Sequence, residues 1–165
     1  MNYKKYIGSI SNFPIEGITY RDIQPLLAND IIFHSAIKDM GKLIKEVPDY
    51  WIALESRGFL FASALSIELG GGIRLIRKKG KLGNNQVMRA DYGLEYGEDS
   101  FEMAYLPEFD LGKVVIVDDV YATGGTMQAA QGLCEKLGYE VSDKLCLMDI
   151  GIVKDHDVKC LISYE

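Results

Sequence analysis

The sequence lacks the features by which several protein classes are recognised. No apolar run approaches the roughly 18 residues that a membrane span needs, and the first residues lack the apolar core of a signal peptide. We therefore expect a cytoplasmic protein without membrane contact. Its three cysteines, Cys134, Cys146 and Cys160, are odd in number and widely spaced, which argues against a disulfide framework or a zinc site and favours core thiols. The two histidines, His34 and His156, stand alone, so we expect surface or capping positions for them.

Positive charge is also scarce. Lysine and arginine number 18 against 24 acidic residues, which gives a net charge of −6. Because a phosphate backbone demands clustered positive charge, we do not expect a nucleic-acid partner. The 165 residues, 48% of them hydrophobic, suit one globular domain that spans residues 1–165.

The most informative stretch covers residues 114–126, VVIVDDVYATGGT. Its four opening aliphatic residues suit a strand buried on both faces of a parallel sheet. Asp118 and Asp119 follow, then a glycine-bearing turn, and then an apolar helical pattern that Gly138 would end. Ligands of parallel sheets collect at the carboxyl ends of strands, and a helix start presents unpaired amides. We therefore expect an anion to bind there.

The residue types of this turn narrow the choice of anion. Gly124 and Gly125 let the backbone approach a phosphate closely, and the hydroxyls of Thr123 and Thr126 add donors. The two preceding aspartates would repel a phosphate unless the ligand also offers hydroxyl donors, as ribose does, or an associated magnesium ion. The sequence contains neither a Walker A lysine nor a G-x-G-x-x-G pattern, which disfavours nucleoside triphosphates and dinucleotides.

The stretch resembles the phosphoribosyl diphosphate binding motif of phosphoribosyltransferases, in which an aliphatic run, two acids and a Thr-Gly-Gly-Thr loop follow one another. The resemblance implies a ribose held by Asp118 and Asp119, and it places Val120 at the base. It also implies that the loop seats a 5′-phosphate on Ala122, Thr123, Gly124, Gly125 and Thr126.

An irregular apolar segment over residues 13–23 has two explanations. It could simply be laid across the core, or its backbone could read the edge of a flat aromatic ligand. The segment resembles the base-recognition loop of adenine phosphoribosyltransferases, which implies that Thr19 packs on adenine and that the main chain of Arg21 pairs with it. Glu16 departs from the family, where proline is common at this position.

A second strand-loop-helix unit is predicted over residues 50–69, with the sequence Glu-Ser-Arg-Gly between strand and helix. Arg57 by itself would suggest a surface ion pair. However, the loop resembles the diphosphate loop of the family, which implies that Ser56 and Arg57 bind diphosphate and that the loop contains a cis peptide bond that does not precede proline.

Residues 77–81, Arg-Lys-Lys-Gly-Lys, form the densest positive cluster of this acidic chain. A solvated turn would explain them, but such a cluster repels itself unless an anion lies nearby. The segment resembles the family's basic loop, which implies that Arg77 and Lys81 reach diphosphate, often in a neighbouring subunit. On that ground we expect a homodimer. The family's usual proline is missing, and Gly83 with two asparagines takes its place.

Residues 82–100 are polar and predict a long hairpin, the mobile part of a flexible catalytic loop over about 77–100. Tyrosines at alternate positions could merely decorate such a hairpin. The run Leu-Glu-Tyr-Gly nevertheless resembles the family's catalytic loop, which implies that Glu95 is the acid or base at the purine and that Tyr96 shields the reacting centre.

Together these patterns predict an α/β fold with a mainly parallel central sheet, helices on both faces and a small N-terminal hood over about residues 1–30. The resemblance implies an adenine phosphoribosyltransferase of purine salvage that forms AMP and diphosphate from adenine and phosphoribosyl diphosphate. It also implies that Mg²⁺ arrives with the substrate, without direct protein ligands. Transfer to another purine base, or a non-catalytic regulator that senses phosphoribosyl diphosphate, are the alternatives.

Overall fold

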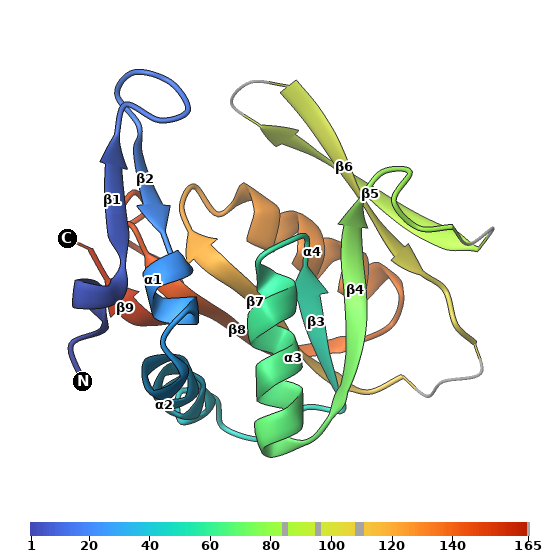
Figure 1. Cartoon of the computed structure of the whole chain (residues 1–165). Coiled ribbons are helices and arrows are strands. Elements are labelled where there is room, and N and C mark those ends of the chain that lie inside the picture. The colour runs from blue at the N-terminus through green and yellow to red at the C-terminus, as the bar shows by residue number, and fades with distance from the viewer. Residues whose placement is uncertain (84–85, 95–96, 108–110, 165) are drawn as a thin grey trace.

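A seven-stranded sheet runs through the centre of the computed structural model, which describes residues 1–83, 86–94, 97–107 and 111–164, with only the backbone of 90–94 and 97–99 (Figure 1). The strand order is β5-β6-β4-β3-β7-β8-β9. Five strands are parallel to one another, namely β3 (Tyr50–Leu54), β4 (Gly72–Lys78), β7 (Lys113–Tyr121), β8 (Glu140–Asp149) and β9 (Lys159–Ser163). An antiparallel hairpin of β5 (Val87–Leu94) and β6 (Gly97–Ala104) extends the sheet beyond β4. A hairpin was predicted in this part of the chain.

Helices cover both faces of this sheet. α2 (Asp30–Gly41) and α3 (Gly58–Leu69) contribute to one core and α4 (Gly125–Lys136) to the other. The four aliphatic residues that open β7 divide between the two cores, Val115 and Val117 facing α2 and α3, and Val114 and Ile116 facing α4. All four are fully buried. The predicted fold class, a mainly parallel sheet flanked by helices, is confirmed.

The first thirty residues form structure of their own beside the large sheet. They contain the 3₁₀ helix η1 (Tyr3–Tyr6), a two-stranded antiparallel sheet of β1 (Gly8–Ser11) and β2 (Thr19–Asp22), and α1 (Gln24–Leu27). Buried Ile23 and Leu26 attach this segment to the core that α2 and α3 share. Figure 1 shows the β1–β2 and β5–β6 hairpins on either side of the end to which β3 and β4 point.

Two local predictions were wrong. The helical spacing of apolar residues from Ile32 to Ile44 predicts one helix over residues 31–46, but the helix ends at Gly41, and Leu43 and Ile44 reach the core from a turn that follows it. His156 does not stand alone, since its Nε2 lies 3.3 Å from Oδ2 of Asp149 and its ring centroid 4.3 Å from that of Tyr121. His34 is exposed, as expected.

The cysteines are free thiols, buried at Cys134 and Cys146 and half-buried at Cys160, as predicted for core residues. Across the described ranges, no helix combines the length and the apolar character that a bilayer crossing demands.

Candidate active site

The two aspartates lie where β7 ends, at the carboxyl edge of the sheet. Asp119 is only 5% exposed, and Oδ1 of Asp118 accepts a hydrogen bond of 2.8 Å from the Asp119 amide. Burial, and then the neighbouring charge of Asp119, raise the pKa of Asp118 well above its ordinary value. Burial also raises the pKa of Asp119, although Arg57 opposes it. A ligand that donates hydroxyls to the pair would favour its fully ionised form.

Arg57 connects this acidic pair with the N-terminal segment. Its Nε lies 2.9 Å from Oδ2 of Asp119, and its Nη1 donates a hydrogen bond of 3.1 Å to the hydroxyl of Tyr20. The arginine belongs to the loop between β3 and α3, where the peptide bond between Glu55 and Ser56 is cis, as the resemblance predicted. The predicted ribose and diphosphate loops are therefore in direct contact.

Gly58, the first residue of α3, is what allows this contact. A Cβ atom there would lie 2.6 Å from the carbonyl oxygen of Val117 and 3.2 Å from Cα of Asp118. Only glycine lets α3 begin this close to the end of β7. The helix start thereby places Arg57 beside the acids.

The glycine-bearing turn joins β7 to α4. Gly124 adopts φ of +85°, a left-handed conformation that favours glycine, and directly precedes the first residue of the helix. A Cβ there would lie 2.8 Å from the Tyr121 hydroxyl. A pocket of about 50 Å³ lies here, lined by residues of β7, the turn and the first turn of α4: Asp118, Val120, Tyr121, Ala122, Thr123, Gly124, Thr126 and Met127. Helix-start amides and carboxylates therefore border one small polar pocket.

The basic segment lies at the end of β4, next to Glu55. Arg77 reaches the Glu55 carboxylate with Nε at 3.2 Å and donates from Nη1 to the carbonyl of Lys81 at 3.0 Å. Burial alone would raise the pKa of Glu55, but hydrogen bonds from the Lys78 amide and Arg77 outweigh it and lower that pKa below the ordinary value. The Lys81 side chain is exposed. In this structure Arg77 is thus held by Glu55 rather than beside the aspartates.

Of the residues predicted to bind the base, Thr19 and Arg21 lie on β2, whereas Val120 lies on β7 and lines the pocket at the turn. Thr19 is exposed, whereas the Arg21 side chain turns away, bonded to the Ser9 hydroxyl and lying 4.0 Å from the Tyr164 ring centroid. Any contact of Arg21 with a base is thereby left to its main chain. Ser56 is exposed in the loop before Arg57.

Four predicted residues lie outside the described part of the chain. They are Glu95 and Tyr96 of the expected catalytic loop, and the two asparagines that follow Gly83. Sequence reasoning in turn gave no role to the side chains of Glu55, Tyr20 or Tyr121. Their only signal was position, since each directly neighbours a predicted site residue.

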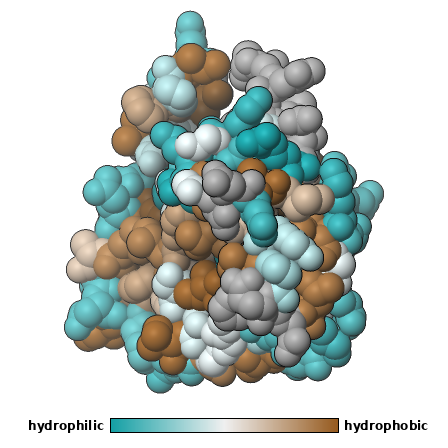
Figure 2. All heavy atoms as spheres, turned by 90° about the vertical axis from the view of Figure 1, so that its right-hand side faces the viewer, coloured by the Kyte–Doolittle hydropathy of each residue, from teal (hydrophilic) through white to brown (hydrophobic). Residues whose placement is uncertain are grey.

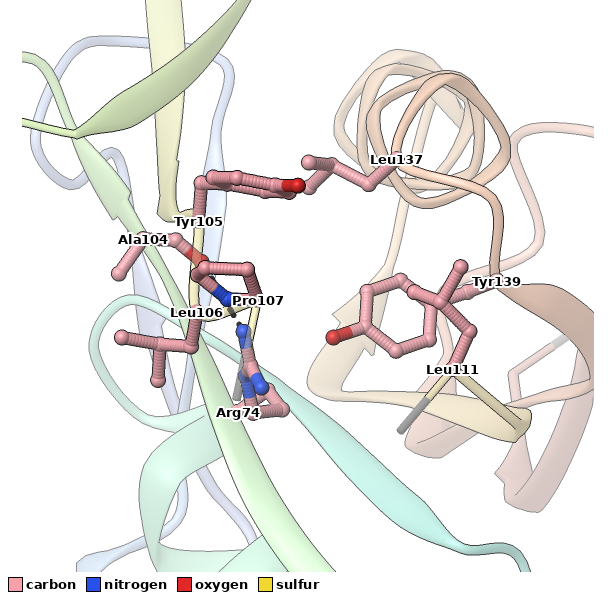
Figure 3. Close-up of a pocket in the computed structure, with 8 residues that line it drawn as sticks. All are labelled: Arg74, Ala104, Tyr105, Leu106, Pro107, Leu111, Leu137 and Tyr139. Atoms are coloured by element: carbon pink, nitrogen blue, oxygen red, sulfur yellow. Dashed lines mark hydrogen bonds between the residues drawn. The ribbon is translucent and has the colours of Figure 1, made fainter. Parts of the chain in front are cut away.

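A second pocket, of about 190 Å³, lies towards the opposite end of the sheet (Figure 3). Leu137 and Tyr139, between α4 and β8, form one wall, and Tyr105 to Pro107 form another. At its floor the buried Arg74 donates from Nη2 to the Ala104 carbonyl at 3.0 Å, and its guanidinium carbon lies 5.7 Å from the ring centroids of Tyr50 and Tyr139. This arrangement stabilises the end of the sheet away from the aspartates.

Comparison with known proteins identifies this constellation. The phosphoribosyl transferase domain family matches residues 22–162, so the chain belongs to the phosphoribosyltransferases. The adenine phosphoribosyltransferase of Hydrogenovibrio crunogenus is 44% identical over 171 residues, which cover 98% of this chain and 95% of that protein. Within its family the chain therefore belongs with the adenine phosphoribosyltransferases.

Solved structures agree with this assignment. The crystal structure of adenine phosphoribosyltransferase from Thermoanaerobacter pseudethanolicus matches with a TM-score of 0.87 at 36% identity, covering 98% of this chain and 97% of that one. The Saccharomyces cerevisiae enzyme, complexed with adenine and D-2,5-dideoxy-2,5-imino-altritol 1,6-bisphosphate, matches with a TM-score of 0.86 at 33% identity, covering 96% and 95%.

Proposed function

We propose that this chain joins N9 of adenine to C1′ of phosphoribosyl diphosphate, with inversion, and releases AMP and diphosphate in purine salvage. The observation that carries the proposal is the 2.9 Å contact between Arg57 and Asp119. Through that contact an anion-binding helix start, an acidic pair and a cationic loop form one site. A sugar with a phosphate at one end and a diphosphate at the other matches this alternation of charge.

Each part of the site has a role in this reaction. The turn from Ala122 to Thr126 holds the 5′-phosphate, and Asp118 and Asp119 hold the ribose hydroxyls. Positive charge grows on the ribosyl ring as diphosphate leaves, so the two carboxylates stabilise the transition state electrostatically. Diphosphate is bound by the cationic loops, through Ser56, Arg57, Arg77 and Lys81. For Arg77 this requires that the diphosphate compete with Glu55 for its guanidinium.

The base site and the proton transfer are assigned on the family resemblance. Thr19, the Arg21 main chain and Val120 contact adenine. Glu95 handles the purine proton, and Tyr96 covers the reacting centre. General acid or base help of this kind contributes about 10² to 10⁴ in rate.

Magnesium fits this site as part of the substrate. Oxygen donors of the Asp118 and Asp119 type suit Mg²⁺, but Arg57 already lies against Asp119, and the described residues contain no group of three metal-ligating side chains. We therefore propose that diphosphate and ribose oxygens hold the ion. When bound, it neutralises charge on the leaving group.

We also propose a homodimer, because an apolar surface lies beside the basic segment. Leu60 and Ile67 on α3 are 45% and 90% exposed, and Ile73 and Leu75 on β4 are 37% and 39% exposed. Each pair projects from one side of its element. Figure 2 shows apolar side chains gathered on this side of the molecule. A contiguous apolar surface of this kind marks an interface, and β4 leads from it directly to Arg77.

Sedimentation tests the dimer. Ile67→Asp should yield monomers of reduced activity, whereas Ile152→Asp, at a residue that is 58% exposed far from α3 in the chain, should leave the assembly intact. A fully active monomer would contradict the proposal. The cytoplasmic location stays a prediction.

The enzymatic assay uses the purified chain, magnesium chloride and labelled phosphoribosyl diphosphate, with adenine, hypoxanthine, guanine and xanthine in parallel. We expect labelled AMP from adenine and far less product from the other bases. Labelled product from hypoxanthine, guanine or xanthine in preference to adenine would reassign the base. If the chain binds phosphoribosyl diphosphate but forms no product with any base, it is a sensor rather than an enzyme.

A further inference from the structure

Tyr20 lies between the two β2 residues proposed to contact adenine, yet its side chain faces the site of the other substrate. Its hydroxyl accepts a hydrogen bond of 3.1 Å from Nη1 of Arg57. The guanidinium carbon of Arg57 also lies 5.4 Å from the centre of the Tyr20 ring. Since Nε of the same guanidinium lies 2.9 Å from Asp119, one arginine joins the base strand to the acidic pair.

The Tyr20 ring is held in place by its own surroundings. Phe13 packs against it edge-on, with centroids 5.3 Å apart and planes at 74°. The next residue, Arg21, is fixed on the other side of β2 by Ser9 and the Tyr164 ring. Tyr20 therefore offers Arg57 a hydrogen-bond acceptor of fixed position.

Two fixed partners determine how Arg57 is oriented. A guanidinium carries five N–H donors in one rigid plane, so the ion pair of its Nε side with Asp119 and the hydrogen bond from Nη1 to Tyr20 together set the direction of the other donors. Without the tyrosine hydroxyl, the guanidinium could rotate to place two donors on the Asp119 carboxylate. Arg57 would then be withdrawn from an incoming anion.

We propose that Tyr20 is a positioning residue that keeps Arg57 oriented for diphosphate and couples occupancy of the base site to diphosphate affinity. The coupling follows from the fold, because a base that settles on Thr19 and Arg21 contacts the residues on both sides of Tyr20 in the same strand, so any shift of that strand moves the Tyr20 hydroxyl relative to Arg57. By linkage, diphosphate must strengthen adenine binding by the same factor. The inference rests on the function proposed above.

Tyr20→Phe removes the hydroxyl and keeps the ring. Calorimetry with inorganic diphosphate and magnesium chloride, with and without adenine, should show a dissociation constant for diphosphate raised about three- to tenfold, as expected when one ordinary hydrogen bond that orients Arg57 is lost. In the wild type, the dissociation constant for diphosphate without adenine should exceed the constant with adenine. In Tyr20→Phe the ratio of these two constants should fall to about one. Tyr3→Phe is the matched control, since the Tyr3 hydroxyl bonds Asp39 at 2.6 Å and Ser35 at 3.0 Å, and it should change neither quantity.

A double variant separates this role from general loosening of the N-terminal segment. In an Arg57→Lys background, Tyr20→Phe should have no further effect, because the hydroxyl acts through the guanidinium. An equal effect in both backgrounds, or an unchanged diphosphate constant in Tyr20→Phe, would overturn the role of Tyr20. A wild-type chain that forms no AMP would instead refute the proposed function.

Discussion

Glycine-to-alanine substitutions in two helices should have opposite effects on this protein. Gly58 begins α3, and a Cβ there would lie 2.6 Å from the Val117 carbonyl oxygen. Gly132 lies inside α4, and a Cβ there would meet no atom within 4 Å. The same methyl group therefore enters a tight backbone contact in one helix and open space in the other.

The size of the Gly58→Ala effect follows from that contact. Ordinary van der Waals contact begins at 3.4 Å, so the first turn of α3 must move by about 0.8 Å, the difference between 3.4 and 2.6 Å. The atom that it meets belongs to the buried central strand, which cannot give way easily. Overpacking of this kind costs about 1–3 kcal/mol, or a melting temperature lowered by about 2–10 °C at this chain length. Gly132→Ala should instead stabilise the protein by about 0.5–1 kcal/mol.

Catalysis should respond more strongly than stability. Because Arg57 directly precedes Gly58, the same displacement moves its guanidinium relative to Asp119, and misplacement by about 1 Å can cost about a hundredfold in rate. Urea unfolding and steady-state kinetics with phosphoribosyl diphosphate measure the two effects, and Gly132→Ala should retain full activity. A Gly58→Ala enzyme that equals the wild type in both measurements would refute the argument that glycine is needed at this contact.

The remaining predictions concern the acids and the phosphate turn. The folded-state pKa of Asp118 is raised above its ordinary 3.8, so the protein is more stable at low pH, where Asp118 is protonated, and loses that stability as the pH rises. Asp118→Asn should therefore melt at a higher temperature than the wild type at neutral pH, with a gain that shrinks towards pH 3.8, while its activity falls. A lower melting temperature of this variant at neutral pH would contradict the prediction. Asp119→Asn should lower kcat at least about a hundredfold, since it removes one charge aimed at the ribosyl ring; an effect confined to KM would argue for a binding role alone. Glu95→Gln should lower kcat by about 10² to 10⁴ and leave substrate KM nearly unchanged, and an unaltered kcat would remove this residue from the mechanism. Thr126→Val should mainly raise the KM for phosphoribosyl diphosphate, by about five- to tenfold, and a drop in kcat at unchanged KM would assign Thr126 to the chemical step instead.

Local patterns carried much of the prediction. Three features could be predicted from the sequence: the aliphatic run of β7, the aspartates at its end and the glycine turn before α4. Burial on two faces, the end of a strand and a left-handed turn each favour particular residue types at adjacent positions. The end of α2 was misplaced because Leu43 and Ile44 keep a helical spacing while they pack from a turn.

The sequence by itself determined which residue types stand at the strand ends, and on that ground it predicts that an anion with hydroxyl groups binds there. Only the tertiary structure decided which of those ends meet. β3 and β7 are neighbours although β4, β5 and β6 separate them in the chain, so Arg57 reaches Asp119. Tyr20 reaches Arg57 across 37 positions by the same kind of folding. Residue patterns record the environment of each segment, whereas the order of strands in a sheet is set by the packing of all the segments together.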